Sequence, residues 1–192
     1  MTIDIHAHYI PAELVARVRE SKGALGVTVV EGAATPALAF DYGFKVRPFF
    51  PKLVETAAER MAWLDSACID RQFVATWPDI YGYGLAREKC VAWHRVLNDT
   101  LAAWCADHPR FGFVASVPLP NVDDAVIELT RICDLGALGV MLPANVENTN
   151  IGELTLDKLW AKAEALDCPI IIHPVLVGPA PRAAKFGLTQ ST

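Results

Sequence analysis

Short apolar segments alternate with amphipathic helical segments along most of this chain, and no other feature constrains the fold as strongly. The apolar segments predict strands within residues 2–9, 71–76, 111–117, 138–142 and 170–173. Segments with apolar residues at helical spacing predict helices at 12–20, 52–67, 86–106, 123–135 and 156–166. Short apolar strands joined by helices are typical of a parallel sheet that helices cover. The sequence therefore predicts an α/β fold.

The ends of the predicted strands favour a βα-barrel over a dinucleotide-binding sheet. No Gly-x-Gly-x-x-Gly pattern follows the first strand, whereas a proline closely follows each of the last four. His8 and His173 stand at carboxyl ends of strands, which is where a TIM-type (β/α)8 barrel carries its chemistry. We predict such a barrel as one domain over residues 1–192, with a small β-insertion at residues 24–50 after the first helix.

The number of strands is smaller than a closed barrel needs. Five strands are predicted where a TIM-type barrel has eight, and 192 residues fall short of the roughly 250 that such barrels usually take. The sequence stops in a loop-like stretch, Gly187–Thr192. We therefore expect the N-terminal part of a longer, truncated barrel, whose first and fifth strands leave apolar edges exposed.

The first strand carries two histidines at a spacing of two, His6 and His8. Side chains alternate between the two faces of a strand, so Asp4 is expected to share a face with both histidines. Two imidazoles so placed can chelate one metal ion, and imidazole suits zinc and other first-row transition metals. A chance His-x-His in a buried strand is the alternative. Asp4 is either an acceptor that orients a ligand imidazole or a buried structural carboxylate.

A third histidine ends the last predicted strand. The apolar run Ile170–Ile172 is followed by His173 and then by Pro174, which stops the strand. A polar imidazole at the end of an apolar strand needs a partner, and a metal ion shared with His6 and His8 supplies one. The alternative is that all three are hydrogen-bonded core histidines.

The remaining histidines, His94 and His108, are not predicted as ligands. His94 lies within a predicted helix beside Arg95 and is expected at the surface. His108 stands at the end of that helix, where an imidazole complements the negative pole of the helix dipole.

Charge and composition exclude several classes of partner. The formal net charge is -5 and no basic run occurs, which argues against nucleic acid and against an anionic membrane surface. No uninterrupted apolar stretch approaches the ~20 residues of a membrane span, and an acidic residue at position 4 argues against a signal peptide. The five cysteines form no Cys-x-x-Cys pair and are expected to be reduced thiols of a cytoplasmic protein.

These features together resemble the amidohydrolase superfamily, and within it the group typified by aminocarboxymuconate semialdehyde decarboxylase. The likeness is carried by Ile3–His8 and Ile170–Pro174, and is supported by the β-insertion, by Arg60–Asp65 and by His108–Gly112. The resemblance implies a metal-bearing βα-barrel in which His6, His8 and His173 are ligands of one divalent ion, usually zinc. It also implies an acid/base histidine on the sixth strand and an aspartate ligand on the eighth, both beyond Thr192.

Two further side chains are expected at the substrate site. The decarboxylases that this chain resembles hold a substrate carboxylate with an arginine of the insertion, and Arg47 lies there. A guanidinium suits that task because it is a planar, bidentate donor. An exposed arginine beside Pro48 is the alternative. Trp77 ends the second barrel strand and is expected to line the pocket, unless it is a core aromatic.

The predicted site and the resemblance together indicate an enzyme that decarboxylates a small organic acid non-oxidatively. The metal ion would lower the pKa of a bound water and orient the substrate. The same ligands would serve hydrolysis of an amide, lactone or ester, and this alternative stays open. So does a different class, an inactive fragment or partial barrel that needs the missing C-terminal half. A homodimer is a further expectation.

Overall fold

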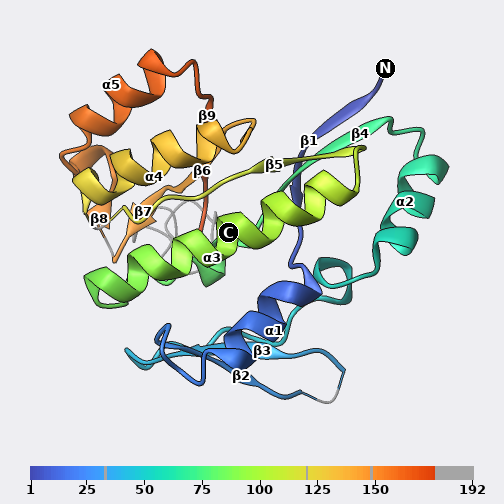
Figure 1. Ribbon diagram of the computed structural model, residues 1–192, viewed down its shortest axis with the longest axis horizontal. Helices are drawn as coiled ribbons and strands as arrows, with labels where there is room; N and C mark the ends of the chain where they lie inside the picture. The colour runs from blue at the N-terminus through green and yellow to red at the C-terminus, as the bar shows by residue number, and fades with distance from the viewer. Residues whose placement is uncertain (33, 120, 148, 176–192) are drawn as a thin grey trace, which may run out of the picture.

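The five predicted barrel strands form parallel pairs in the computed structural model, which describes residues 1–32, 34–119, 121–147 and 149–175 (Figure 1). β1 (Ile3–His8), β4 (Arg71–Ala75) and β5 (Phe111–Val114) form one sheet in that order, and β6 (Val140–Pro143) pairs with β9 (Ile170–His173). A parallel bridge between Ala115 and Val140 joins the two groups. The strands thus follow chain order across the molecule, as expected of successive βα units. The stretch 187–192, expected as a loop, lies outside the described residues.

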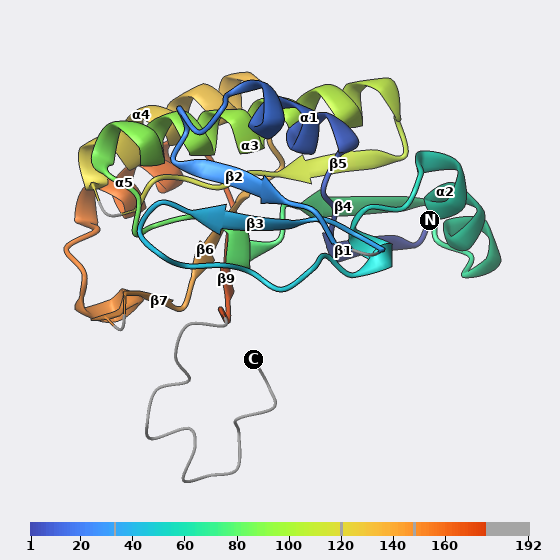
Figure 2. The same ribbon diagram turned by 90° about the horizontal axis from the view of Figure 1, so that it is seen from below.

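Helices cover one face of these strands. In the described part of the chain they are α2 (Ala57–Ser66), α3 (Arg87–Asp107), α4 (Val122–Asp134) and α5 (Asp157–Ala165). The remaining helix, α1 (Ala12–Glu20), packs in a separate cluster with the insertion. Figure 2 shows α3 and α4 together on one side of the strands. Val74 and Phe113 point to that side and pack with Leu129 in the main core cluster. Their neighbours Ala75 and Val114 point to the other face and belong to a separate cluster, as alternation in a strand requires.

Helix α2 begins later than the periodicity predicts. Pro51–Leu53 form a short 3-10 turn, η1, and α2 starts only after Thr56. The Thr56 hydroxyl accepts a hydrogen bond from the Glu59 N–H at 3.2 Å, and the Glu59 carboxylate accepts one from the Thr56 N–H at 2.8 Å. This reciprocal pair satisfies two backbone donors at a helix start and so sets the boundary.

Strand β5 ends at Val114, earlier than the predicted 117, because a side chain takes the place of a neighbouring strand. The Ser116 N–H donates to Asn98 Oδ1 at 2.9 Å, and Asn98 Nδ2 donates to the Ser116 carbonyl at 2.8 Å. These bonds satisfy the backbone of Ser116 without a strand ladder.

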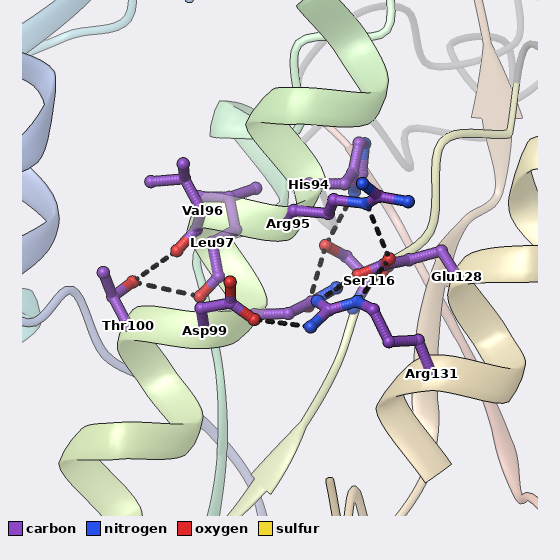
Figure 3. Close-up of polar contacts among 10 residues, drawn as sticks. His94, Arg95, Val96, Leu97, Asp99, Thr100, Ser116, Glu128 and Arg131 are labelled. Carbon is purple, nitrogen blue, oxygen red and sulfur yellow. Dashed lines mark hydrogen bonds and ion pairs between the residues drawn. The ribbon is translucent and has the colours of Figure 1, made fainter. Parts of the chain in front are cut away.

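The prediction that His94 lies at the surface is wrong. Figure 3 shows His94 in a cluster of polar contacts with Ser116. His94 is fully buried, with its Nδ1 2.8 Å from the Ser116 hydroxyl and its ring stacked on Tyr83. The reason is that α3 contributes to two core clusters, one against the sheet and one against the insertion. Few positions on such a helix face solvent, even next to a charged residue such as Arg95.

A buried carboxylate extends this polar cluster to α4 (Figure 3). Glu128 accepts a hydrogen bond from Asn98 Nδ2 at 2.7 Å and forms an ion pair with Arg131 at 2.7 Å. Arg131 also pairs with Asp99 of α3 at 2.7 Å. The cluster therefore ties α3, α4 and the residues after β5 to one another.

The region expected as a β-insertion contains an antiparallel hairpin of β2 (Val27–Val30) and β3 (Ala37–Phe40). The hairpin packs with α1 and α3 around Trp93. The sequence did not predict the hairpin of β7 (Asn145–Val146) and β8 (Thr149–Asn150), because two-residue strands show no alternation. The short 3-10 turns η2 (Pro78–Ile80) and η3 (Ile151–Glu153) complete the described elements.

The outer strands carry exposed apolar side chains, as the sequence predicts. Ile5 on β1 is 62% exposed and Ile172 on β9 is 49% exposed. Among the described residues, no helix combines the length and apolar character that a membrane crossing requires. The five cysteines are all free thiols.

Candidate metal centre

The first strand departs from simple alternation where its histidines lie. Asp4 pairs with Gln72 and His8 pairs with Ala75, so four residue steps on β1 match three on β4. Such a bulge turns the residues on its two sides to opposite faces of the sheet. The prediction that Asp4 shares a face with both histidines is therefore wrong. Asp4 lies on the face of Gln72, and His8 lies on the face of Ala75.

The imidazoles of His6, His8 and His173 converge at the carboxyl ends of β1 and β9. The ring centroids are 5.2 Å apart for His6 and His8, 5.0 Å for His6 and His173, and 4.9 Å for His8 and His173. One nitrogen from each ring lies within 4.8 Å of the other two. The structure thus brings together the three side chains that the sequence predicts to meet.

Burial lowers the pKa of two of the three histidine rings, those of His8 and His173. Desolvation, followed by the effects of the neighbouring His173 and His6 rings, lowers the pKa of His8 to about 4. The pKa of His173 is also lowered, mainly because that ring is partly buried. A neutral imidazole offers a nitrogen lone pair, which is the form that binds a metal ion.

The spacing of the His8 and His173 nitrogens fits two ligands of one divalent ion. Two nitrogens that each lie ~2.0–2.2 Å from an ion are roughly 3.0–3.5 Å from each other, and His8 Nε2 and His173 Nε2 are 3.2 Å apart. The second nitrogen of His173, Nδ1, contacts the Pro174 carbonyl. A ligand histidine commonly donates its other N–H to such a carbonyl, which leaves the Nε2 lone pair for the ion.

A comparison with known protein families identifies the family of this chain. Residues 3–190 match the family model described as Amidohydrolase. The chain belongs to the amidohydrolase family. All three converging histidines lie within the matched range. The family resemblance that the sequence carries is confirmed.

Curated relatives of this chain are decarboxylases. It is 28% identical over 117 residues to 2-amino-3-carboxymuconate-6-semialdehyde decarboxylase of Dictyostelium discoideum, a match over 60% of this chain and 33% of that protein. It is 33% identical over 99 residues to gamma-resorcylate decarboxylase of Rhodococcus jostii (strain RHA1), over 46% of this chain and 30% of that protein. Each match therefore covers about a third of the relative.

A solved structure shares the fold. Dihydroxybenzoic acid decarboxylase from Polaromonas sp. JS666, with bound manganese and the inhibitor 2-nitroresorcinol, matches with a TM-score of 0.66 at 20% identity. The match covers 96% of this chain and 52% of that chain, so this chain spans about half its length. The likeness shows that the strands and helices described above are those of an amidohydrolase α/β fold.

The two predicted substrate residues lie together beside a cleft that His6 and His8 line. The Arg47 guanidinium lies 4.3 Å from the centroid of the Phe50 ring and 5.4 Å from that of Trp77. Phe50 lines a cleft of about 520 Å³ whose walls also include His6 and His8. Arg47 is exposed and Trp77 is buried. The arginine thus stands one aromatic ring away from this cleft, and a role in substrate binding stays a prediction for both residues.

Sequence reasoning missed two buried polar residues next to the histidine strand, Arg60 and Gln72. Only 5% of Arg60 and 2% of Gln72 are exposed. Arg60 stands at helical spacing from Ala57 and Leu64, on the side of the helix predicted to be buried, and Gln72 interrupts an apolar strand. A charged residue on an apolar helix face and an amide within an apolar strand are the signals that would have found them.

Proposed function

We propose that this protein is a metal-dependent carboxy-lyase that removes carbon dioxide non-oxidatively from a small organic acid. The observation that carries the proposal is the convergence of His6, His8 and His173 in a member of the amidohydrolase family. Relatives named as decarboxylases, one of them for gamma-resorcylate, support a hydroxylated aromatic acid as the substrate class. The manganese bound in the Polaromonas enzyme supports a divalent ion. The sequence predicts zinc, so the assay described below compares Zn²⁺ with Mn²⁺.

We infer that the five parallel strands belong to a closed, eight-stranded barrel. Support comes from their order along the chain and from the apolar side chains exposed on both outer strands, Ile5 and Ile172. Closure of a barrel pairs such edges and removes them from solvent. The histidines would then lie at the carboxyl-terminal mouth of the barrel, where this fold carries its chemistry.

Different residues of this chain would bind the metal ion and the substrate. His6, His8 and His173 would hold one divalent ion through neutral imidazole nitrogens. When bound, that ion supplies positive charge that polarises and orients a substrate oxygen. Arg47 would bind a carboxylate of the substrate through its planar guanidinium, and the flat faces of Phe50 and Trp77 restrict where that guanidinium lies.

Decarboxylation at this site needs no oxidant. The bond between the carboxyl carbon and the adjacent carbon breaks, carbon dioxide leaves, and the electron pair that stays on the adjacent carbon takes up a proton. Orientation of the acid between Arg47 and the histidines would place the breaking bond near the positive charge that stabilises the developing carbanion.

Release of carbon dioxide from 2,6-dihydroxybenzoate tests the proposal, measured with either Mn²⁺ or Zn²⁺ and with a purified protein in which these five strands are completed to the closed barrel. We expect carbon dioxide and resorcinol in equal amounts, loss of the reaction on chelation, and loss in His173→Ala. Hydrolysis of a lactone or amide, with no carbon dioxide from this acid or from a muconate-like acid, would show that the protein is a hydrolase instead.

A further inference from the structure

A buried arginine, Arg60 of α2, makes direct contact with the strand that carries His6 and His8. Its Nη2 donates to the carbonyl oxygens of His8 at 2.9 Å and of Lys52 at 2.8 Å. Its Nη1 donates to Gln72 Oε1 at 2.7 Å. The carboxylate of Glu55, itself largely buried, lies 3.2 Å from Nε and balances the charge. The guanidinium therefore joins three segments of the chain at one point.

Gln72 extends this contact to the other histidine of the strand. Its Nε2 donates to Asp4 Oδ2 at 2.8 Å, and Asp4 Oδ1 accepts from the backbone N–H of His6 at 3.1 Å. That N–H lies in the bulge between Asp4 and Ala7, where the pairing of β1 with β4 shifts register. A bulge leaves a backbone donor outside the ladder, and the Asp4 carboxylate supplies its acceptor.

We propose that Arg60, Gln72 and Asp4 are positioning residues for the metal centre. Arg60 holds the backbone carbonyl of His8, and the series Arg60–Gln72–Asp4 holds the backbone N–H of His6. Both imidazoles are thus set from the main chain, while their rings face His173. This inference rests on the proposed role of the histidines as ligands and adds the residues that hold two of them in place.

The bulge explains why such a support is needed. A shift of one residue in strand pairing turns every following side chain to the opposite face. If β1 paired regularly with β4, Asp4 and His6 would share a face, and the carboxylate could not lie beside Gln72 while the ring faces His173. The hydrogen bonds from Asp4 to the His6 N–H and to Gln72 stabilise the bulged register, and Arg60 anchors Gln72.

Charge alone predicts the opposite effect of Arg60 on metal affinity. A guanidinium close to a cation site repels the ion, so removal of a purely electrostatic Arg60 would tighten metal binding. Burial also disfavours the charged form of Arg60 itself. Desolvation lowers the pKa of its guanidinium, and the neighbouring Glu55 opposes that shift only in part. A positioning role, in contrast, predicts that metal binding weakens when Arg60 is replaced.

Titration of the purified protein with Mn²⁺, with free ion followed by electron paramagnetic resonance, tests the proposal. Arg60→Met, Gln72→Met and Asp4→Ala should each weaken Mn²⁺ binding by about tenfold or more, which is the effect of losing partners that orient metal ligands. Asp4→Asn removes the charge but keeps an acceptor for the His6 N–H. It should therefore retain most of the affinity that Asp4→Ala loses.

Arg110→Met is the matched control for loss of an arginine that binds backbone carbonyls, although Arg110 is only partly buried. Arg110 also donates to backbone carbonyls, those of Ile69 and Asp70, but these lie before β4 at the end remote from the histidines. Its replacement should lower the free energy of unfolding in urea and leave Mn²⁺ affinity unchanged. If Arg60→Met does not fold, Arg60→Lys tests the positioning role instead. Lysine keeps the charge beside Glu55 but lacks the fork that reaches several acceptors, so Mn²⁺ binding should still weaken.

A second measurement reports geometry without activity. The visible absorption bands of the Co²⁺-loaded protein depend on the arrangement of ligands, and they should shift in Arg60→Lys and Gln72→Met but not in Arg110→Met. If the parent protein binds no metal, the proposed function is wrong. If the parent binds Mn²⁺ and the variants bind it equally tightly, or if Arg110→Met weakens binding as much as they do, the positioning role is wrong and the ligand role stands.

Discussion

His8 Nε2 and His173 Nε2 lie 3.2 Å apart, although 165 residues separate them in the sequence. Their strands, β1 and β9, are the first and last of the five parallel strands and are not paired with each other in the described structure. The two rings therefore meet through the curvature of the strands between them. The candidate site depends on the whole arc from β1 to β9.

Loss of any one of the three histidines should remove most of the bound metal. His6→Ala, His8→Ala and His173→Ala each delete one ligand, and the affinity should fall by more than the ~10–100-fold that loss of an outer partner costs. Metal content after dialysis, measured by plasma mass spectrometry, checks this. His108→Ala is the control, since His108 lies at the end of α3 with its Nδ1 2.7 Å from the Trp104 carbonyl. Equal metal content in all four variants would contradict the site.

Arg47→Ala should weaken the reaction of an anionic substrate. Loss of a hydrogen-bonded charged partner costs about 1.5–3 kcal/mol, which corresponds to roughly 10–100-fold in kcat/KM. A rise in KM reports lost binding, and a fall in kcat reports lost orientation of the reacting carbon. Arg47→Lys keeps the charge without the planar fork. Its kcat/KM should lie between those of the parent and of Arg47→Ala. An unchanged kcat/KM in Arg47→Ala would show that this arginine is only a surface residue packed on Phe50.

Folding stability should fall below about pH 6.5 because of His94. Burial lowers the pKa of His94 to about 3, whereas a histidine in the unfolded chain titrates near 6.5. Above this pH both states are neutral at this residue. Below it the unfolded chain binds a proton that the folded chain does not, so the free energy of unfolding drops by up to about 1.4 kcal/mol per pH unit until the pH approaches 3.

Urea unfolding of the parent and of His94→Gln isolates this contribution. Glutamine does not titrate and keeps a polar partner for Ser116, so the variant should lose less stability than the parent between about pH 7.5 and about pH 5.5. The same pH dependence in both proteins would mean that His94 takes up its proton in the folded state.

The 192-residue chain should self-associate through its exposed outer strands. Ile5 and Ile172 present apolar surface on strand edges that can pair with another chain. Sedimentation velocity should show association that decreases in Ile5→Lys and in Ile172→Lys. Ile127→Lys is the matched control, because Ile127 is 58% exposed but lies on helix α4. A monomeric parent, or an equal effect of all three substitutions, would contradict this prediction.

The order of the five parallel strands and of the helices followed from the sequence, because an apolar stripe or an apolar run is a local property of the chain. Boundaries followed less well where a side chain ends the element. Thr56 delays α2 through its capping pair with Glu59, and Asn98 ends β5 by binding the backbone of Ser116. The Asn98 contact joins residues 18 positions apart, so no short window of sequence contains it.

The burial of His94 was decided by tertiary structure. Its neighbours in the sequence are a tryptophan and an arginine, which are compatible with either environment. Whether that side of α3 meets solvent depends on how the insertion and the sheet pack around the helix, and this packing involves contacts between distant segments.

The sequence by itself determined the candidate metal ligands. The residue type, the spacing of His6 and His8 and the place of His173 at a strand end are all visible in the chain, and the structure brings the three rings together. Only the tertiary structure decided what supports them. The bulge that turns Asp4 away from the rings exists because β1 pairs with β4 in a shifted register. The buried guanidinium of Arg60 needs acceptors from several segments, and those segments meet only in the folded chain.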